Sequence, residues 1–299
     1  MLYRCARTPP AQPVSLWRYR LGCPPHRGEG VVRPTLDDFI ALALAAGREI
    51  MAVRDAGFDT QTKLDGSPVT LADQRAELVI ENGLKALAPD VPMIGEEAVA
   101  EGRIPECGET FFCVDPLDGT RGFAKGGDEF TVNIALVEDC MPALGVVYAP
   151  ATGELYAGEP GRAVKALCEP QTARPMTPFE PIATKPSPRW RVVASDHSGR
   201  NARTAQFIAA LDCEVTHASS SLKFCRLAEG AADIYPRFGE VSEWDAAAGH
   251  AILRAAGGDI MRLDGSPLRY GDRVGGFLIK GFVAYANADA KAAALKALG

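Results

Sequence analysis

Two segments in the first half of the chain carry apolar residues at the spacing of an amphipathic helix. In residues 35–55 and again in residues 71–87, apolar side chains recur every three or four positions. Thr35 precedes the first apolar positions and is a suitable N-cap, because its hydroxyl can accept a backbone hydrogen bond. The stretch between the two segments contains glycine and proline, which indicates a turn and then extended chain. We therefore predict two helices joined by an irregular connection.

Shorter runs rich in β-branched residues follow, and they predict strands. Residues 91–97 read as a short strand that ends in two acids, and residues 110–120 as a buried strand that leads into a tight loop. Residues 130–150 hold two apolar runs around a polar turn, which predicts a hairpin, and residues 153–159 add a further strand. Residues 167–189 contain several prolines and little periodicity, so we expect a connection between two halves of the chain.

Strand and helix patterns alternate in the second half, which is typical of an α/β arrangement. Predicted strands cover residues 191–196, 214–220, 232–238 and 281–287. Predicted helices cover residues 201–211, 221–231 and 243–258, and an alanine-rich helix closes the chain. A hairpin is predicted at residues 258–271, with Asp264 and Gly265 at its turn. The fold class we expect is α/β, with an α+β N-terminal half and an α/β C-terminal half.

Three regions follow from these patterns. Residues 1–33 are rich in arginine and proline and lack the continuous apolar core of a secretory signal. They are a disordered basic tail, an organelle-type presequence or sequence translated from upstream of the true start; we favour a tail or a misplaced start, without a catalytic role. We expect residues 34–170 to form an α+β metal-binding domain, and residues 171–299 to form an α/β domain that completes the active site.

Composition and charge narrow the functional classes. The chain has 299 residues, 47% of them apolar, which is enough for a large buried core. Its formal net charge of -6 gives no general affinity for the nucleic-acid backbone, so we expect no nucleic-acid partner. No apolar run approaches the ~20 residues of a membrane-spanning helix. The eight cysteines are irregularly spaced and form no CxxC pair, which indicates free thiols in the reducing cytoplasm.

The most informative segment is a loop with two acids, VDPLDGTRGF. Its Asp115 and Asp118 are three positions apart, and such a pair is unfavourable when buried unless a cation compensates it. Pro116 stiffens the loop, Gly119 lets it turn sharply, and Thr120 would present a hydroxyl beside a bound ion. Two carboxylates with a backbone carbonyl between them are oxygen ligands of the kind that Mg²⁺ prefers. The loop is therefore a candidate half of a magnesium site.

Other acids stand at predicted element junctions, and each has an ordinary alternative explanation. Glu96 and Glu97 are also consistent with a charged loop, and Asp73 with an exposed helix acid. Asp245 alone fits a helix N-cap or an acid in the first helical turn. The metal hypothesis therefore depends on the order and combination of these acids. The lack of clustered histidines and cysteines argues against zinc.

Three of these motifs, taken together, resemble a known family. The sequences GEE, DPLDGT and WDAAAGH occur in this order, ending at Glu97, Thr120 and His250. They resemble the signature of the inositol monophosphatase superfamily, whose members are Mg²⁺-dependent, lithium-sensitive phosphatases. The resemblance extends from about Pro34 to the end of the chain and implies a layered α-β-α-β-α fold.

Further segments are similar to one branch of that superfamily. Residues 127–150, 220–239 and 243–251 resemble the bacterial CysQ branch, the 3′(2′),5′-bisphosphate nucleotidases. The resemblance implies hydrolysis of adenosine 3′,5′-bisphosphate to AMP and phosphate, and action on its sulfated relative, 3′-phosphoadenylyl sulfate. The implied setting is sulfate assimilation in the cytoplasm, with peripheral attachment to the inner face of the membrane suggested by some relatives.

The resemblance also implies roles for single residues. Asp73 and Thr120 would orient and deprotonate the attacking water, and Glu96 would join them in catalysis. Two or three Mg²⁺ ions would be bound by Glu96, Asp115, the main-chain carbonyl of Leu117, Asp118 and Asp245. The substrate would be held by Gly119, Thr120, His197, Ser220, Lys223, Arg237 and Asp245.

One departure from the branch and three alternatives bear on these expectations. The branch often has Lys-Glu where this chain has Arg121 and Gly122. The basic charge is kept but the acid is absent, so the preference of this protein among bisphosphates can differ from that of the branch. The core motifs are equally compatible with an inositol or sugar phosphatase of the same superfamily. From other classes, a non-catalytic binder of nucleotide phosphates and a structural or interaction protein with surface acids are also considered. The sequence is compatible with a monomer or a homodimer.

Overall fold

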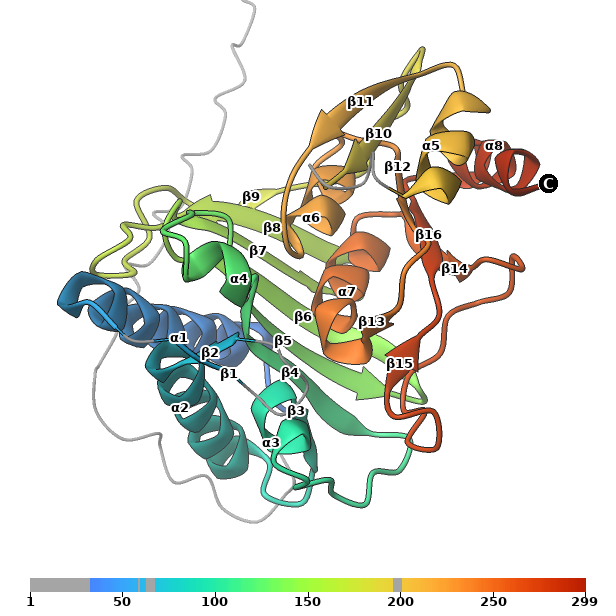
Figure 1. Ribbon diagram of the computed structural model, residues 1–299. Coiled ribbons are helices and arrows are strands. Elements are labelled where there is room, and N and C mark those ends of the chain that lie inside the picture. The colour runs from blue at the N-terminus through green and yellow to red at the C-terminus, as the bar shows by residue number, and fades with distance from the viewer. Residues whose placement is uncertain (1–32, 59, 63–67, 196–200) are drawn as a thin grey trace, which may run out of the picture. The chain divides into compact units, whose positions relative to one another are not determined.

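A seven-stranded and a five-stranded sheet form the framework of the described residues (Figure 1). The computed structural model describes residues 33–58, 60–62, 68–195 and 201–299. In the larger sheet the strands follow their order along the chain, and every pair after the first is antiparallel. Its strands are β3 (Met93–Gly95), β4 (Phe111–Asp118), β5 (Thr131–Glu138), β6 (Met141–Ala149), β7 (Glu154–Glu159), β8 (Arg162–Leu167) and β9 (Glu180–Pro181).

The smaller sheet has mixed strand directions. Its strands in spatial order are β11 (Cys213–His217), β10 (Trp190–Ala194), β12 (Ile234–Arg237), β16 (Phe282–Tyr285) and β14 (Asp259–Arg262). The first three are parallel, whereas β16 is antiparallel to both of its neighbours. Two short antiparallel pairs lie outside these sheets: β1 (Thr60–Thr62) with β2 (Pro68–Thr70), and β13 (Val241–Ser242) with β15 (Leu278–Ile279).

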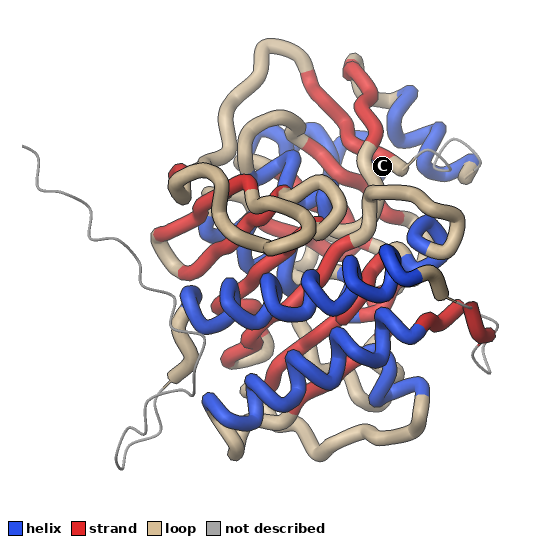
Figure 2. The backbone as a smooth tube through the Cα atoms, turned by 90° about the vertical axis from the view of Figure 1, so that its left-hand side faces the viewer, coloured by secondary structure: helices blue, strands red, loops and turns tan. Residues whose placement is uncertain are grey.

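Helices cover the outer faces of both sheets and fill the space between them. Helices α1 (Leu36–Ala56) and α2 (Leu71–Leu87) lie side by side over one face of the larger sheet (Figure 2). Between the sheets lie α6 (Leu222–Ala228) and α7 (Ala247–Ala255), and α5 (Ala202–Ala209) and α8 (Ala288–Leu298) pack on the far face of the smaller sheet. Short helices α3 (Glu96–Ala100) and α4 (Thr120–Phe123) follow β3 and β4. The expected α-β-α-β-α layering is confirmed.

The alternation of side chains along the strands produces this layering. On β5, Val132, Ile134 and Leu136 pack into the core beneath α1 and α2. Ala135 and Val137, on the opposite face of the same strand, pack into the core shared with α6 and α7. Each central strand therefore contributes to two cores, and this is why both of its faces are apolar.

Two glycines let α7 approach the larger sheet closely. A Cβ atom added to Gly145 on β6 would lie 2.5 Å from the main-chain oxygen of Ala248. A Cβ atom added to Gly158 on β7 would lie 2.6 Å from the Cα atom of Ile252. The helix backbone thus rests directly on the strands, which brings the segment just before α7 against the end of β4.

The structure corrects several predictions. Residues 243–258 are not one helix: a 3-10 turn, η2 (Glu243–Asp245), precedes α7, because the Asp245 carboxylate accepts a hydrogen bond from the backbone N–H of Ser242 and caps the turn. The hairpin at 258–271 is reduced to a single bridge between Met261 and Pro267, because Pro267 lacks a backbone donor, and β14 pairs along its length with β16. Strand β8 was not predicted, and β9 lies in the segment expected to be irregular.

The described residues all belong to one compact unit, Val32–Gly299. The larger sheet takes its strands from residues 93–181 and the smaller from residues 190–285, so β9 lies beyond the expected boundary at residue 170. The division into two domains stays a prediction. Within the described residues, no helix has both the length and the apolar character that crossing a membrane requires.

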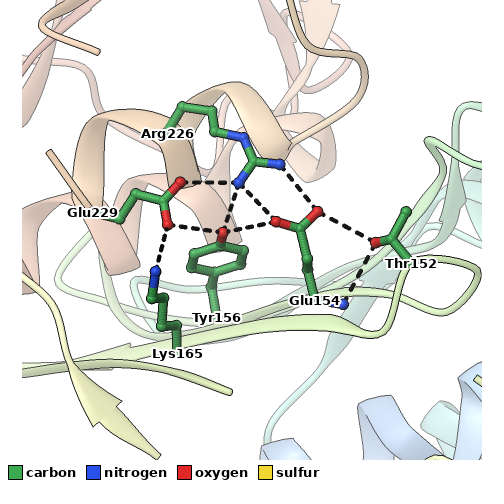
Figure 3. A network of polar contacts seen from close by, with 6 residues as sticks. All are labelled: Thr152, Glu154, Tyr156, Lys165, Arg226 and Glu229. Carbon is green, nitrogen blue, oxygen red and sulfur yellow. Dashed lines mark hydrogen bonds and ion pairs between the residues drawn. The ribbon is translucent and has the colours of Figure 1, made fainter. Parts of the chain in front are cut away.

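A network of charged side chains ties α6 to the larger sheet (Figure 3). The guanidinium of Arg226 donates to both carboxylate oxygens of Glu154, at 2.7 and 3.0 Å, and to Glu229 at 2.9 Å. It also donates to the hydroxyl of Tyr156 at 2.8 Å, and Lys165 donates to Glu229 at 3.1 Å. Burial alone would raise the pKa of Glu154, but Arg226 outweighs it and holds that pKa below its ordinary value.

We expect Arg226→Met to lower the free energy of unfolding by about 2 kcal/mol, because it leaves half-buried carboxylates without their partner. A depressed carboxyl pKa stabilises the fold above the ordinary value of 4.5, so the difference from the parent should shrink as the pH falls below 4.5. Urea denaturation at several pH values measures both effects.

Arg162→Met is the matched control. Arg162 pairs with Glu159 at 3.4 Å on the surface, with 48% of its side chain exposed, so the change should stay within about 0.5 kcal/mol. Equal losses at the two positions would contradict a stabilising role for the network.

Candidate active site

Carboxylates from distant parts of the chain converge at the end of β4. Ligand atoms of Asp115, Asp118 and Asp245 all lie within 4.8 Å of one another. The first two belong to β4 and the third to η2, so the close packing of α7 on the sheet brings them together. Glu96, the first residue of α3, is close enough for its charge to raise the pKa of all three. The structure thus brings three of the four acids expected to bind metal within ligand distance of one another, and Glu96 lies near enough to affect their charge.

Local backbone geometry shapes the acidic segment. The pairing of β4 with β5 shifts register between Asp115 and Asp118, and the backbone N–H of Leu117 donates to Asp115 Oδ1 at 3.0 Å. Gly119 follows with a φ of 96°, a left-handed conformation that favours glycine. A Cβ atom on Gly119 would lie 2.5 Å from the hydroxyl of Ser220. A side chain at this position would therefore both strain the turn and push away the segment before α6.

The protein alone does not neutralise these carboxylates. Burial and then the charge of Glu96 raise the pKa of Asp115 well above its ordinary value. Burial and the charge of Asp118 raise the pKa of Asp245 to about 8, and burial also raises the pKa of Asp118, against the opposing charge of Lys223. Asp115 Oδ2 is buried and has no hydrogen-bond partner among the described residues. This oxygen-rich, uncompensated set fits a divalent cation with a preference for hard ligands.

Asp73 and Thr120 lie next to the cluster and contact each other. The hydroxyl of Thr120 lies 3.1 Å from Asp73 Oδ1 and 3.0 Å from the main-chain oxygen of Leu117. With one proton, it donates to one of these acceptors at a time. Asp73 Oδ2 accepts two hydrogen bonds from Thr70, which caps α2, and burial still raises the pKa of Asp73. The expected catalytic pair is therefore in contact, 47 residues apart in sequence.

A pocket of about 470 Å³ opens beside the carboxylates. Asp118 and Asp245 belong both to its wall and to the acidic cluster. Of the expected substrate contacts, Gly119, Ser220, Lys223 and Arg237 also line it, whereas Thr120 does not. His197 lies outside the described residues. The structure thus joins the acidic cluster to one pocket that contains two basic side chains.

The two basic residues differ in how they are held. Lys223, only 7% exposed, donates to the main-chain oxygen of Ser220 at 2.6 Å, and its Nζ lies 5.3 Å from the ring centre of Tyr235. Burial lowers the pKa of Lys223 to about 8, although the charge of Asp118 opposes this. Arg237 donates to the main-chain oxygen of Glu240, but its Nε is buried without a partner in the described part of the chain. The pocket therefore offers positive charge with unused donor capacity.

Sequence analysis did not identify several residues at this site. Ser221, 1% exposed, lies with its hydroxyl 3.3 Å from Asp118 Oδ2, and Asn133 on β5 donates to that hydroxyl. The only signal in the sequence is a polar residue inside the apolar run FTVNIAL. Gly122, which the sequence analysis named as a departure from the bacterial branch, does line the pocket. Other unpredicted lining residues are Gly127, Asp128, Glu129, Ser219, Phe224, Tyr235, Val241 and Phe282.

Comparison with known proteins places the chain in a family. Residues 33–297 match the inositol monophosphatase family. A Shigella flexneri protein named 3′(2′),5′-bisphosphate nucleotidase CysQ is 41% identical over 256 residues, covering 83% of this chain and 98% of the relative. The protein of that name from Escherichia coli K12 is 40% identical over 250 residues, with the same coverage. A crystal structure of CysQ from Bacteroides thetaiotaomicron superposes with a TM-score of 0.67 at 34% identity, over 84% of this chain and 96% of that one. The chain therefore belongs to the inositol monophosphatase family.

Proposed function

We propose that this protein is a Mg²⁺-dependent phosphatase that hydrolyses the 3′-phosphate of adenosine 3′,5′-bisphosphate to give AMP and phosphate. The observation that carries the proposal is that Asp118 and Asp245 are shared between an uncompensated carboxylate cluster and a pocket with two basic side chains. The relatives named 3′(2′),5′-bisphosphate nucleotidase support this substrate. We extend the proposal to 3′-phosphoadenylyl sulfate, which carries the same 3′-phosphate, and to a role in sulfate assimilation.

The acidic cluster is the proposed metal site. Glu96, Asp115, Asp118, Asp245 and the carbonyl of Leu117 would hold two or three Mg²⁺ ions. When bound, these ions would neutralise charge on the phosphoryl group and make water more acidic, which is the chemistry a slow phosphate monoester hydrolysis requires. Inositol monophosphatase family enzymes are metal-dependent, and the oxygen-only donor set supports magnesium.

Asp73 and Thr120 would move the proton of the attacking water. Thr120 Oγ1 can accept a hydrogen bond from water while it donates its own proton toward Asp73 Oδ1, 3.1 Å away. Burial raises the pKa of Asp73, so its carboxylate holds a proton more readily than an exposed aspartate does. The pair would thereby orient the water for attack and take up the proton that it loses.

Lys223, Arg237 and Ser220 would bind the phosphate that does not react. Charge-assisted hydrogen bonds from Lys223 and Arg237 suit a second phosphate and would select a bisphosphate over a monophosphate. An inositol or sugar phosphatase would share the metal site but has less use for two basic residues in the pocket. We propose the cytoplasm as its compartment, because the six cysteines among the described residues are free thiols.

Phosphate release from a substrate panel tests the function. We expect adenosine 3′,5′-bisphosphate to be cleaved with a kcat/KM at least about tenfold above that of inositol 1-phosphate, and only with Mg²⁺. Asp118→Asn should lower kcat by about 10³-fold while the thermal transition persists, and Asp90→Asn at an exposed position should change nothing. Faster cleavage of inositol 1-phosphate would favour the sugar-phosphatase alternative, and tight binding without phosphate release would favour a non-catalytic binder.

Lys223→Met tests the proposed selectivity. Loss of a charged donor should lower kcat/KM for adenosine 3′,5′-bisphosphate by about 10- to 100-fold but affect 3′-AMP far less. Because the pKa of Lys223 is about 8, the parent should lose part of this preference as the pH rises through 8, whereas the variant should not. Lys296→Met, on the exposed side of α8, is the matched control. Equal losses on both substrates would contradict the assigned role.

Stability without metal should depend on pH in a characteristic direction. A carboxyl group whose pKa is raised by folding stabilises the fold below its ordinary value of 3.8, and this stability is lost as the pH rises through the folded value, about 8 for Asp245. The Tm of chelator-treated protein should therefore fall as the pH rises from about 4 to about 8 and level off above that, and Mg²⁺ should restore it most at high pH. Asp245→Asn should flatten both effects. A Tm gain from Mg²⁺ that is independent of pH would contradict this.

A further inference from the structure

A polar pair lies buried in the apolar layer between the two sheets. Asn133 on β5 is fully buried and polar, whereas Ala135 and Val137 on the same face of the strand are apolar core residues. Its Nδ2 donates to the hydroxyl of Ser221, which precedes α6, at 3.0 Å across 88 residues of sequence. Asparagine is depleted in strands, and burying its amide is unfavourable unless it is hydrogen-bonded. The pair therefore requires a compensating contact or a role.

The hydroxyl of Ser221 contacts two of the clustered acids. It lies 3.3 Å from the carboxylate Oδ2 of Asp118 and 2.9 Å from the main-chain oxygen of Asp245. Both atoms can only accept, so the single hydroxyl proton points toward one or the other. One small side chain thus links the end of β4 to the turn η2. The two acids that it contacts, Asp118 and Asp245, are 127 residues apart in the sequence.

This arrangement fixes the orientation of the Asn133 amide. Because the Ser221 proton is committed to Asp118 or Asp245, its oxygen must accept from Asn133, and only the amide nitrogen can donate. Asn133 is also the register partner of Asp115 on β4, so its side chain rises from the strand beside the cluster. Asn133, on a central strand, therefore orients the Ser221 hydroxyl so that its proton points toward Asp118 or Asp245.

We propose that Asn133 and Ser221 are positioning residues of the metal site. Asn133 holds the Ser221 hydroxyl, and Ser221 holds Asp118 and the backbone at Asp245 at a fixed separation against their mutual repulsion. The site is thereby formed before a cation enters it, which increases its affinity for the cation. The inference rests on the proposed metal-dependent function, and neither residue lines the pocket proposed for the substrate.

Calorimetric titration of the full chain with Mg²⁺ tests the proposal. Ser221→Ala and Asn133→Leu should each weaken Mg²⁺ binding by about 10- to 100-fold. The double variant should bind about as weakly as Ser221→Ala alone, because Asn133 acts through Ser221. Activity of Ser221→Ala should recover at high Mg²⁺ concentration with kcat close to that of the parent, which a general loss of folding would not allow. Ser221→Ala also provides the test if Asn133→Leu does not fold.

Thr131→Val is the matched control. Thr131 lies two residues before Asn133 on the same face of β5, is fully buried, and its hydroxyl has no partner among the described residues. Its isosteric replacement should leave the affinity for Mg²⁺ within about twofold. Parent-like Mg²⁺ affinity in Ser221→Ala, or additive losses in the double variant, would overturn the positioning role and leave the proposed function intact. A parent chain that binds no Mg²⁺ would overturn both.

Discussion

Repulsion among buried carboxylates is the constraint on which the site depends. Asp115, Asp118 and Asp245 present oxygens within 4.8 Å of one another in a region where burial already disfavours their charge. The left-handed turn at Gly119 and the close approach of α7 over Gly145 force this proximity. The fold therefore holds the acids together at a cost in stability, which a bound cation offsets.

The residues of the proposed site come from both sheets and from the helices beside them. The end of β4 and the helices next to it supply the acids together with Asp73 and Thr120. Helix α6 and strand β12, on the side of the smaller sheet, supply Lys223 and Arg237. In the proposed function, metal binding would draw on the end of β4 and on η2, and selection among phosphate esters would draw on α6 and β12.

Local signals in the sequence predicted most of the elements but not their partners. The caps at Thr35 and Thr70 and the alternation along β5 determine helices and strands within short windows. That β14 also pairs with β16 depends on a contact distant in sequence, which no local pattern reveals. The acids could be identified because their motifs occur in a known order. The contact of Asn133 with Ser221 could not be identified from the sequence, because it depends on how the start of α6 packs against β5.

Helix α6 and the serine that precedes it carry three side chains with separate contacts. Ser221 precedes it and contacts two acids, Lys223 in its first turn faces the pocket, and Arg226 one turn later is bonded to β7. A small tilt of so short a helix would move all three side chains at once. If Lys223 selects the substrate as proposed, exchanging this segment for that of a relative would alter the contacts of Ser221 with Asp118 and Asp245 together with the substrate preference.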